Sequence, residues 1–382
     1  MKTKVVMVTA MMALIMRGNM GMAQTAAPKT WADSVTVKGD IRYRYESIDD
    51  SSKTYTRERD RIRARLGVEG KCNNYIKTGI ELSTGQSDPI SGNQTIGGGF
   101  DKKDFKLNLA YLEYNMFGDS PNEVKVTAGK MKNPFILLQD DLVWDHDATP
   151  EGMAVKSRFG SGMMRFIANG ARFWIQERSD KADLMLNAGQ GALEIEFIPE
   201  ITLTLGATYY GYENIKGYDV IDWEAKNNAY GNSTVNGTVH GGTTNKAWAA
   251  EFSPMLYFGM LDIWIKNIPV SFFAQTLENG DADKLNKGNM YGVSIGKSKN
   301  PGTWEVGYSH AKVEKDAVVG MLTDSDRWGG GTDGEGDKLY VKYQIMKNLQ
   351  AGITYFMDEK PLSNPAKTKD YERLQIDLVA SF

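Results

Sequence analysis

The sequence predicts an all-β protein, a transmembrane antiparallel β-barrel of about 16 strands with short periplasmic turns and long extracellular loops. Three observations predict it: apolar and polar residues alternate along many segments, the connections alternate between short and long, and the final segment ends in an aromatic residue. An apolar run of ~18 residues, which a membrane helix needs, is missing. The chain is therefore not a helical membrane protein, whereas a barrel is compatible because its strands alternate.

The N-terminus has the features of a secretory signal peptide. Lys2 and Lys4 precede the apolar stretch 5–16, and small residues stand at Gly21 and Ala23. This stretch is too short to span a bilayer, and the small residues fit a cleavage site after Ala23. We expect residues 1–23 to be a signal peptide and residues 24–382 to form the barrel.

Two early segments show the period of two that is typical of a strand with one apolar face. In 35–46, Val37, Ile41 and Tyr43 share one face, and in 56–68 the apolar face is formed by Ile62 and Leu66. The opposite faces carry arginines, which cannot lie in lipid or in an apolar core. We predict that these arginines line a pore: Arg42, Arg44, Arg57, Arg59, Arg61, Arg63 and Arg65.

Similar segments recur to the end of the chain. The predicted strands are 35–46, 55–70, 74–84, 104–116, 123–131, 151–159, 162–177, 183–197, 201–214, 246–257, 261–277, 289–298, 303–314, 337–346, 349–360 and 370–382. Short connections such as 71–73, 258–260 and 347–348 alternate with long ones such as 132–150, 215–245 and 315–336. This segregation is typical of an outer-membrane barrel, with the short side in the periplasm.

The last predicted strand has an apolar face that ends at Phe382 and includes Leu378 and Ile376. These residues would face lipid while the strand closes the barrel edge. A final strand with a terminal aromatic resembles the assembly signature of bacterial outer-membrane proteins. We interpret these three residues as an assembly signal.

Segment 132–150 is too apolar for a freely solvated loop, because it contains Phe135, Trp144 and several aliphatic residues that need burial. It also carries four acidic residues, Asp140, Asp141, Asp145 and Asp147. A loop folded into the barrel would satisfy both demands, and its acids would face the arginines across the lumen. We expect an acidic constriction loop here. An external loop with a small hydrophobic patch remains the alternative.

Several pieces of the chain carry a family resemblance. They are A-G-K-M-K-N-P-F (128–135), W-D-H-D-A-T-P-E-G-M-A (144–154), N-I-P-V-S-F-F-A (267–274), L-T-D-S-D-R-W-G-G-G-T-D-G-E-G (322–336) and the ending L-V-A-S-F. In this order they resemble the putative porin family of Gram-negative bacteria, relatives of the phosphate-selective porins O and P. The resemblance implies a 16-stranded barrel, usually trimeric, that passes small hydrophilic solutes without energy input. Phosphate selectivity does not carry over, because the dense lysine ladder of that subgroup is missing.

The expected function is a passive, water-filled outer-membrane channel for small hydrophilic solutes and ions. The arginines favour anions, while the loop acids and the net charge of −3 favour cations, and we lean towards anions. An outer-membrane adhesin, or a structural barrel without an open pore, is the alternative. Expected partners are outer-membrane lipid, lipopolysaccharide and two further copies of the chain, and the charge balance does not point to nucleic acid.

An enzyme is not expected. The pattern G-V-S-I-G (292–296) matches a nucleophile motif, but it lies within a predicted strand and no helix follows. The single Cys72 and the widely spaced His146, His240 and His310 argue against a metal centre, and no cofactor motif is present. Calcium binding at 333–337 stays open, although the full twelve-residue pattern is missing.

Overall fold

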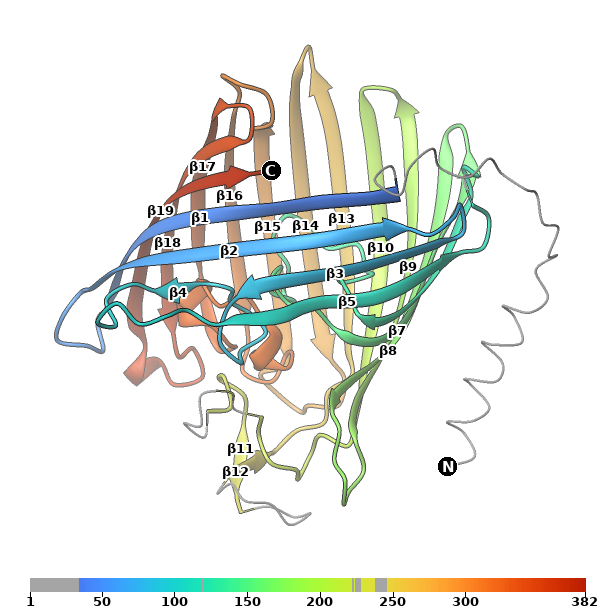
Figure 1. The fold of residues 1–382 in the computed structure, drawn as a ribbon. Helices are drawn as coiled ribbons and strands as arrows, with labels where there is room; N and C mark the ends of the chain where they lie inside the picture. The colour runs from blue at the N-terminus through green and yellow to red at the C-terminus, as the bar shows by residue number, and fades with distance from the viewer. Residues whose placement is uncertain (1–33, 119, 222, 224–227, 238–245) are drawn as a thin grey trace.

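The computed structural model describes residues 34–382 except 119, 222, 224–227 and 238–245, so the predicted signal peptide lies outside the described residues. The main sheet contains 17 strands, of which β4 is a two-residue strand inside a loop. The other sixteen form the wall of a closed antiparallel barrel (Figure 1), because the last strand, β19, pairs with the first, β1. The predicted fold class is therefore confirmed.

Each predicted strand has a counterpart in this wall. The observed bounds are β1 Val35–Asp50, β2 Arg57–Lys71, β3 Ile76–Thr84, β5 Phe105–Asn115, β6 Glu123–Lys130, β7 Glu151–Ser161, β8 Met164–Gln176, β9 Leu184–Ile198, β10 Ile201–Glu213, β13 Pro254–Ile265, β14 Ile268–Asn279, β15 Lys287–Gly296, β16 Trp304–Val313, β17 Gly334–Met346, β18 Leu349–Lys360 and β19 Lys369–Ser381. Three short strands lie in loops: β4 Gln94–Thr95, β11 Thr234–Asn236 and β12 Lys246–Trp248. No helix in the described residues is long and apolar enough to cross a membrane.

One hairpin differs from the prediction. The predicted turn at 258–260 lies inside β13, and the chain turns instead at residues 266–267, between β13 and β14. Residues 246–248 belong to the separate strand β12. Alternation continues through Gly259, whose neighbours Phe258 and Met260 share a face, so the glycine marks no turn. Lys266 adopts the positive φ of 58° that the tight turn requires.

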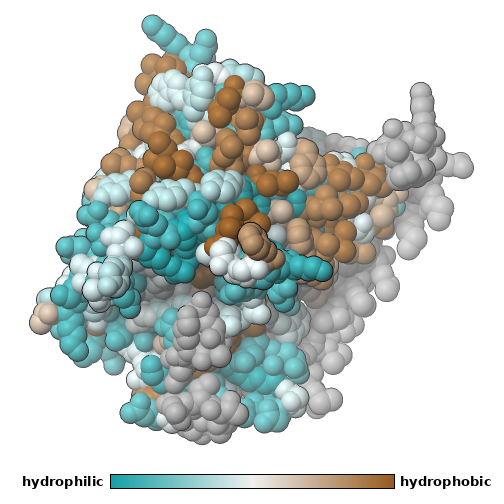
Figure 2. Space-filling view, turned by 60° about the vertical axis from the view of Figure 1, so that its left-hand side comes forward, coloured by the Kyte–Doolittle hydropathy of each residue, from teal (hydrophilic) through white to brown (hydrophobic). Residues whose placement is uncertain are grey.

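The outer face of the barrel is apolar at mid-height. Side chains that alternate with the arginines are exposed on it, including Ile41, Leu66, Ile376 and Leu378. Figure 2 shows apolar side chains gathered in the upper part of one face, with hydrophilic residues below. The hydrophilic part is the end that carries the long loops, where Figure 1 places β11 and β12. This distribution matches an apolar band in the bilayer with hydrated loops outside it.

The barrel closes where Phe382 meets β1. The amide nitrogen of Gly39 donates to the carbonyl oxygen of Phe382 at 3.0 Å, and the amide of Phe382 donates back to Gly39 at 3.0 Å. The phenyl ring lies over Gly39, so that a Cβ atom there would stand 2.6 Å from ring atom Cζ and would also meet the carbonyl oxygen of Arg65. Only glycine fits this contact without a shift.

Gly39→Ala is expected to lower barrel stability, because either the Phe382 ring or the β2 backbone must move. Such overpacking typically costs about 1–3 kcal/mol. The temperature at which the folded, fast-migrating form is lost on a gel measures the effect. Gly191→Ala is the matched control, since a Cβ atom at that position would meet open space. Equal melting of the two variants would contradict this account of the closure.

Candidate functional site

Segment 132–150 packs against side chains that point into the barrel. The ring of Phe135 lies 6.4 Å from Phe173 of β8 and 5.8 Å from Tyr210 of β10, in edge-to-face contacts. Trp144 contacts the same two aromatics at 6.3 and 6.2 Å. The segment's apolar side chains are thus buried against the inner wall, which removes them from water.

Two wall glutamines hold the backbone of the same segment. Gln190 of β9 accepts from the amide of Ile136 at 2.8 Å and donates to its carbonyl oxygen at 3.1 Å. Gln275 of β14 accepts from the amide of Leu142 at 3.3 Å and donates to the carbonyl oxygen of Asp140 at 2.7 Å. These bonds satisfy backbone groups that the irregular loop would otherwise bury unpaired.

Loop 314–333 also lies against the inner wall, and sequence reasoning missed this. The buried part includes Ala317, Val318, Val319, Met321, Leu322, Arg327 and Trp328. Arg327 donates to the hydroxyl of Ser309 of β16 at 2.6 Å and to the carbonyl oxygen of Gly336 of β17 at 3.3 Å. The apolar run 317–322 was the available signal, and it is the same kind of signal that identified segment 132–150.

Asp140 joins the two loops to each other and to the wall. Its carboxylate accepts from the ammonium of Lys338 at 2.5 Å, from the guanidinium of Arg327 at 3.4 Å and from the hydroxyl of Ser309. Although burial acts to raise it, Lys338 and Arg327 hold the pKa of Asp140 well below its usual range. Asp140 is therefore an anchor of the loops. It does not contact the arginines of β1 and β2, which were its expected partners.

Two other predicted acids also lie away from the arginines. Asp141 accepts from the amides of Val143 and Trp144 at 2.8 and 3.0 Å, and burial raises its pKa to about 6. Asp145 accepts from the amide of Ser325 at 3.0 Å, and burial and the nearby Asp324 raise its pKa well above the usual range. The carboxyl groups of Asp145 and Asp324 thus lie near each other where segment 132–150 touches loop 314–333.

Mildly acidic pH is expected to tighten this contact between the loops. A carboxyl whose pKa is raised in the folded state binds its proton more strongly there than in the free chain. The contact therefore gains stability as pH falls through the raised pKa values and loses it as pH rises. Current fluctuations in a planar bilayer should be fewer at about pH 5 than at about pH 8. Asp145→Asn should reduce that difference, and an unchanged pH dependence in this variant would contradict the assignment.

The arginines form a ladder on the inner face of β1 and β2. In the register of these strands Asp40 pairs with Arg65, Arg42 with Arg63, Arg44 with Arg61, and Glu46 with Arg59, while Arg57 lies opposite Ile48. Two adjacent rungs therefore place like charges directly opposite each other, which is unfavourable without counter-charges. Carboxylates supply these counter-charges. Some of them lie at the two ends of the ladder, and others come from β19 and from the loops.

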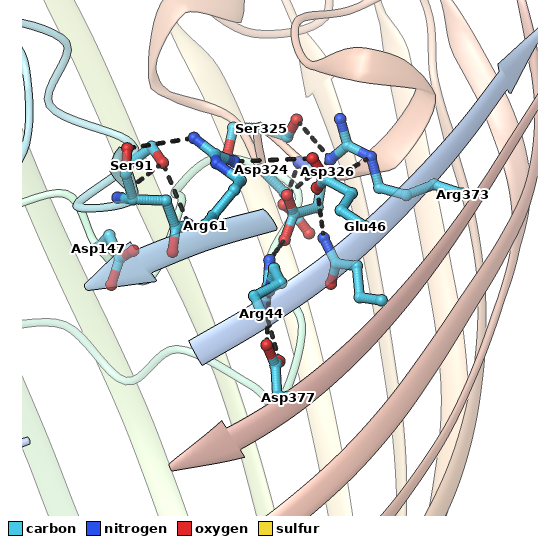
Figure 3. Close-up of polar contacts among 12 residues, drawn as sticks. Arg44, Glu46, Arg61, Ser91, Asp147, Asp324, Ser325, Asp326, Arg373 and Asp377 are labelled. Carbon is cyan, nitrogen blue, oxygen red and sulfur yellow. Dashed lines mark hydrogen bonds and ion pairs between the residues drawn. The ribbon is translucent and has the colours of Figure 1, made fainter. Parts of the chain in front are cut away.

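Five carboxylates contact the ladder. Arg44 donates to Asp377 of β19 at 2.7 and 2.8 Å and to Asp326 of loop 314–333 at 3.2 Å (Figure 3). Asp326 also accepts from Arg373 of β19 at 2.6 Å. Asp40 pairs with Arg63 at 3.0 Å and Arg65 at 2.7 Å, Asp147 with the same two at 3.3 and 3.7 Å, and Glu46 with Arg59. Asp147 is thus the one predicted loop acid that contacts the ladder arginines of β1 and β2.

Apart from the exposed Arg57, two arginines of the ladder have no carboxylate within 3.5 Å. Arg42 donates to the side-chain oxygen of Asn93 at 2.6 Å, and Arg61 donates to the backbone oxygen of Asn93 at 3.2 Å. The closest carboxylate contact of Arg61 is Glu46 at 3.9 Å. Arg57 is exposed at the outer end of β2. Sequence reasoning named the arginines but not Asn93, because nothing in 85–103 marked this loop as part of the pore.

Sequence reasoning also missed five charged residues that lie among the arginines: Asp40, Glu46, Arg373, Asp326 and Asp377. Alternation places Glu46 on the inward face of β1 and Arg373 and Asp377 on that of β19, so the pattern contained their direction. Pairing across the β1–β19 seam brings them to the ladder. That seam joins residues more than 300 positions apart, so a local pattern cannot reveal it.

Three neighbouring cavities share lining residues, and Arg65 is the ladder arginine that lines two of them. One of about 610 Å³ at the loop end is lined by residues that include Ser91, Ser325 and Lys360. A second of about 430 Å³ shares Ser91 with it, and a third of about 500 Å³ shares Arg65 and Asp147 with the second. The third extends to residues near the short-turn end, including Ser381. In the described part of the chain, no cluster of three or more metal-ligating side chains is present.

The comparisons with known proteins fit this geometry. A family described as putative porin matches residues 49–246 and 220–382. Among solved structures, OprB of Pseudomonas putida has a TM-score of 0.58 at 9% identity, covering 92% of this chain and 95% of its own. OmpF of Salmonella typhi, solved with daunomycin, has a TM-score of 0.55 at 12% identity, covering 92% and 99%. A trimer form of OmpT, an outer membrane protein of Vibrio cholerae, has a TM-score of 0.50 at 12% identity, covering 92% and 100%. No curated protein matches the sequence.

Proposed function

This chain belongs to the putative porin family and is a porin of the bacterial outer membrane, and from that premise we propose that it is a passive, water-filled channel for small hydrophilic solutes with a preference for anions. The observation that carries the proposal is the row of neighbouring cavities inside a closed barrel, beside a charged ladder. A wall of sixteen strands is wide enough to enclose water, and inward loops set its narrowest part.

The anion preference rests on the charges that contact one another at the ladder. Seven arginines gather there: Arg42, Arg44, Arg59, Arg61, Arg63, Arg65 and Arg373. The carboxylates in contact with them are five: Asp40, Glu46, Asp147, Asp326 and Asp377. The surplus is positive, and a fixed positive charge beside a narrow aqueous path attracts anions.

Ion current through the refolded, signal-free protein in a planar bilayer tests the proposal. Under a salt gradient we expect stable current steps and a reversal potential of the sign that anion flow produces. A reversal potential of the opposite sign would refute the anion preference but not the channel. No current from protein that keeps its strand content and its heat-modifiable migration would refute the channel, and it would favour an adhesin or a structural barrel.

The proposal extends to the assembly. We propose a homotrimer in contact with outer-membrane lipid and lipopolysaccharide, with Phe382, Leu378 and Ile376 as the assembly signal. These three side chains are exposed on the outer face of β19, or just beyond its end, where a membrane or an assembly factor can reach them. Three linked current steps would support the trimer. A relationship to the phosphate-selective porins O and P is likewise proposed, on the resembling sequence pieces alone.

A further inference from the structure

Two of the ladder arginines differ from the rest in their partners. Arg44, Arg59, Arg63 and Arg65 each contact a carboxylate within 3.5 Å, whereas Arg42 and Arg61 bind the neutral oxygens of Asn93. An amide oxygen accepts a hydrogen bond but does not cancel the charge of a guanidinium. Apart from the exposed Arg57, Arg42 and Arg61 are therefore the least neutralised arginines of the ladder, since Arg61 reaches Glu46 only at 3.9 Å.

The same two side chains have unused donors. The Nε atoms of Arg42 and Arg61 are buried and have no hydrogen-bond partner, which is also true of Nε of the carboxylate-paired Arg63. Buried donors of this kind are costly unless an acceptor can reach them. A planar guanidinium presents its donors in a fork that matches the two oxygens of a carboxylate.

Neither arginine is among the residues that line the three cavities, but both bind Asn93, which is hydrogen-bonded to the cavity-lining Ser91. The amide groups of Asn93, in its backbone and side chain, each lie 3.3 Å from the hydroxyl oxygen of Ser91, which holds Asn93 in place over both arginines. Ser91 lines both the outer cavity and the middle cavity. A solute that passes Ser91 is therefore one residue away from Arg42, which contacts no carboxylate within 4 Å, and from Arg61, whose contact with Glu46 is 3.9 Å long.

On this basis we propose that Arg42 and Arg61 are the solute-selecting residues of the channel and that they recognise small anions bearing a carboxylate. The proposal rests on the channel function proposed above. The solute supplies at these positions the carboxylate that Asp40, Glu46, Asp147 and Asp377 supply to the other arginines. The remaining arginines serve to bind the loops and the neighbouring strands.

Acetate block of the chloride current tests the assignment. Each arginine is replaced by lysine, so that the side-chain charge stays the same in every arginine variant. In the wild type, acetate added at fixed chloride should reduce the current in a saturable way. Arg42→Lys and Arg61→Lys keep the charge but lose the fork, so each should raise the half-blocking acetate concentration about tenfold. Arg44→Lys is the matched control on the same ladder, and it should stay within about twofold because Asp377 and Asp326 already occupy its guanidinium.

Asn93→Asp provides an independent variant, because it places a carboxylate on Arg42 with almost no change of shape. It should abolish the acetate block while the chloride current persists. Heat-modifiable migration shows that each variant has formed its barrel.

An equal effect of Arg44→Lys, or an anion-selective wild-type current that acetate does not block, would overturn this inference and leave the proposed channel intact. Block by inorganic phosphate without block by acetate would overturn the carboxylate assignment. A cation-selective wild-type current would overturn the anion preference and this inference together.

Discussion

Arg327→Met is expected to detach loop 314–333 from the barrel wall and to raise the single-channel conductance. The guanidinium of Arg327 is buried, and it joins Ser309, Gly336 and Asp140. Methionine fills similar volume but leaves these acceptors without their donor. Removing one partner of a buried charged contact costs about 3–5 kcal/mol of stability. We expect a loss of this size to detach the irregular loop from the wall.

Conductance in a planar bilayer and the unfolding temperature measure the effect of Arg327→Met. Arg57→Met is the matched control, since Arg57 is exposed at the outer end of its strand. The double variant with Asp140→Asn should cost less than the two single changes added together, because both act on one network. Unchanged conductance and unchanged stability in Arg327→Met would show that the apolar residues alone hold the loop.

Trp144→Ala is expected to release segment 132–150 from β8 and β10 and to widen the pore there. The indole is 3% exposed and packs on Phe173 and Tyr210. Truncating a buried tryptophan to alanine costs about 3–5 kcal/mol, through lost burial and the cavity left behind. The glutamine contacts to Ile136 and Leu142 remain, but single hydrogen bonds contribute only about 1 kcal/mol each.

The measurement for Trp144→Ala is again conductance, together with the rate of current fluctuations. Trp304→Ala is the matched control, because that indole is 43% exposed. We expect a conductance increase for Trp144→Ala alone. A similar increase in both variants would mean that the barrel itself has been perturbed.

The wall of the barrel could be predicted because it depends on a local pattern. Alternation along a strand decides which residues face lipid, and an apolar band is obligatory in a membrane. This holds for Ile41 and Leu66 on the outer face and for Arg44 and Arg63 on the inner face. The pattern failed at Gly259, where a glycine inside a strand resembled a turn.

The charged site could be predicted only in part, for a physical reason. Alternation gives the direction of a side chain but not its partner across the lumen. Asp140 and Asp147 belong to the same acidic segment, yet one binds Lys338 and the other binds Arg63. Which acid meets which base depends on the path of an irregular loop, and that path is set by packing between distant elements such as Trp144 and Tyr210.

The two like-charge rungs also bear on engineering a wider pore from this scaffold. Arg42 faces Arg63 and Arg44 faces Arg61 across the same strand pair, and Asp147 and Asp326 reach this pair from separate loops. Trimming either loop would enlarge the aperture but would also strip a counter-charge from the sheet. A redesigned variant therefore needs compensating substitutions in β1 or β2 whenever a loop is shortened. Loop length and wall composition are not independent design variables in this barrel.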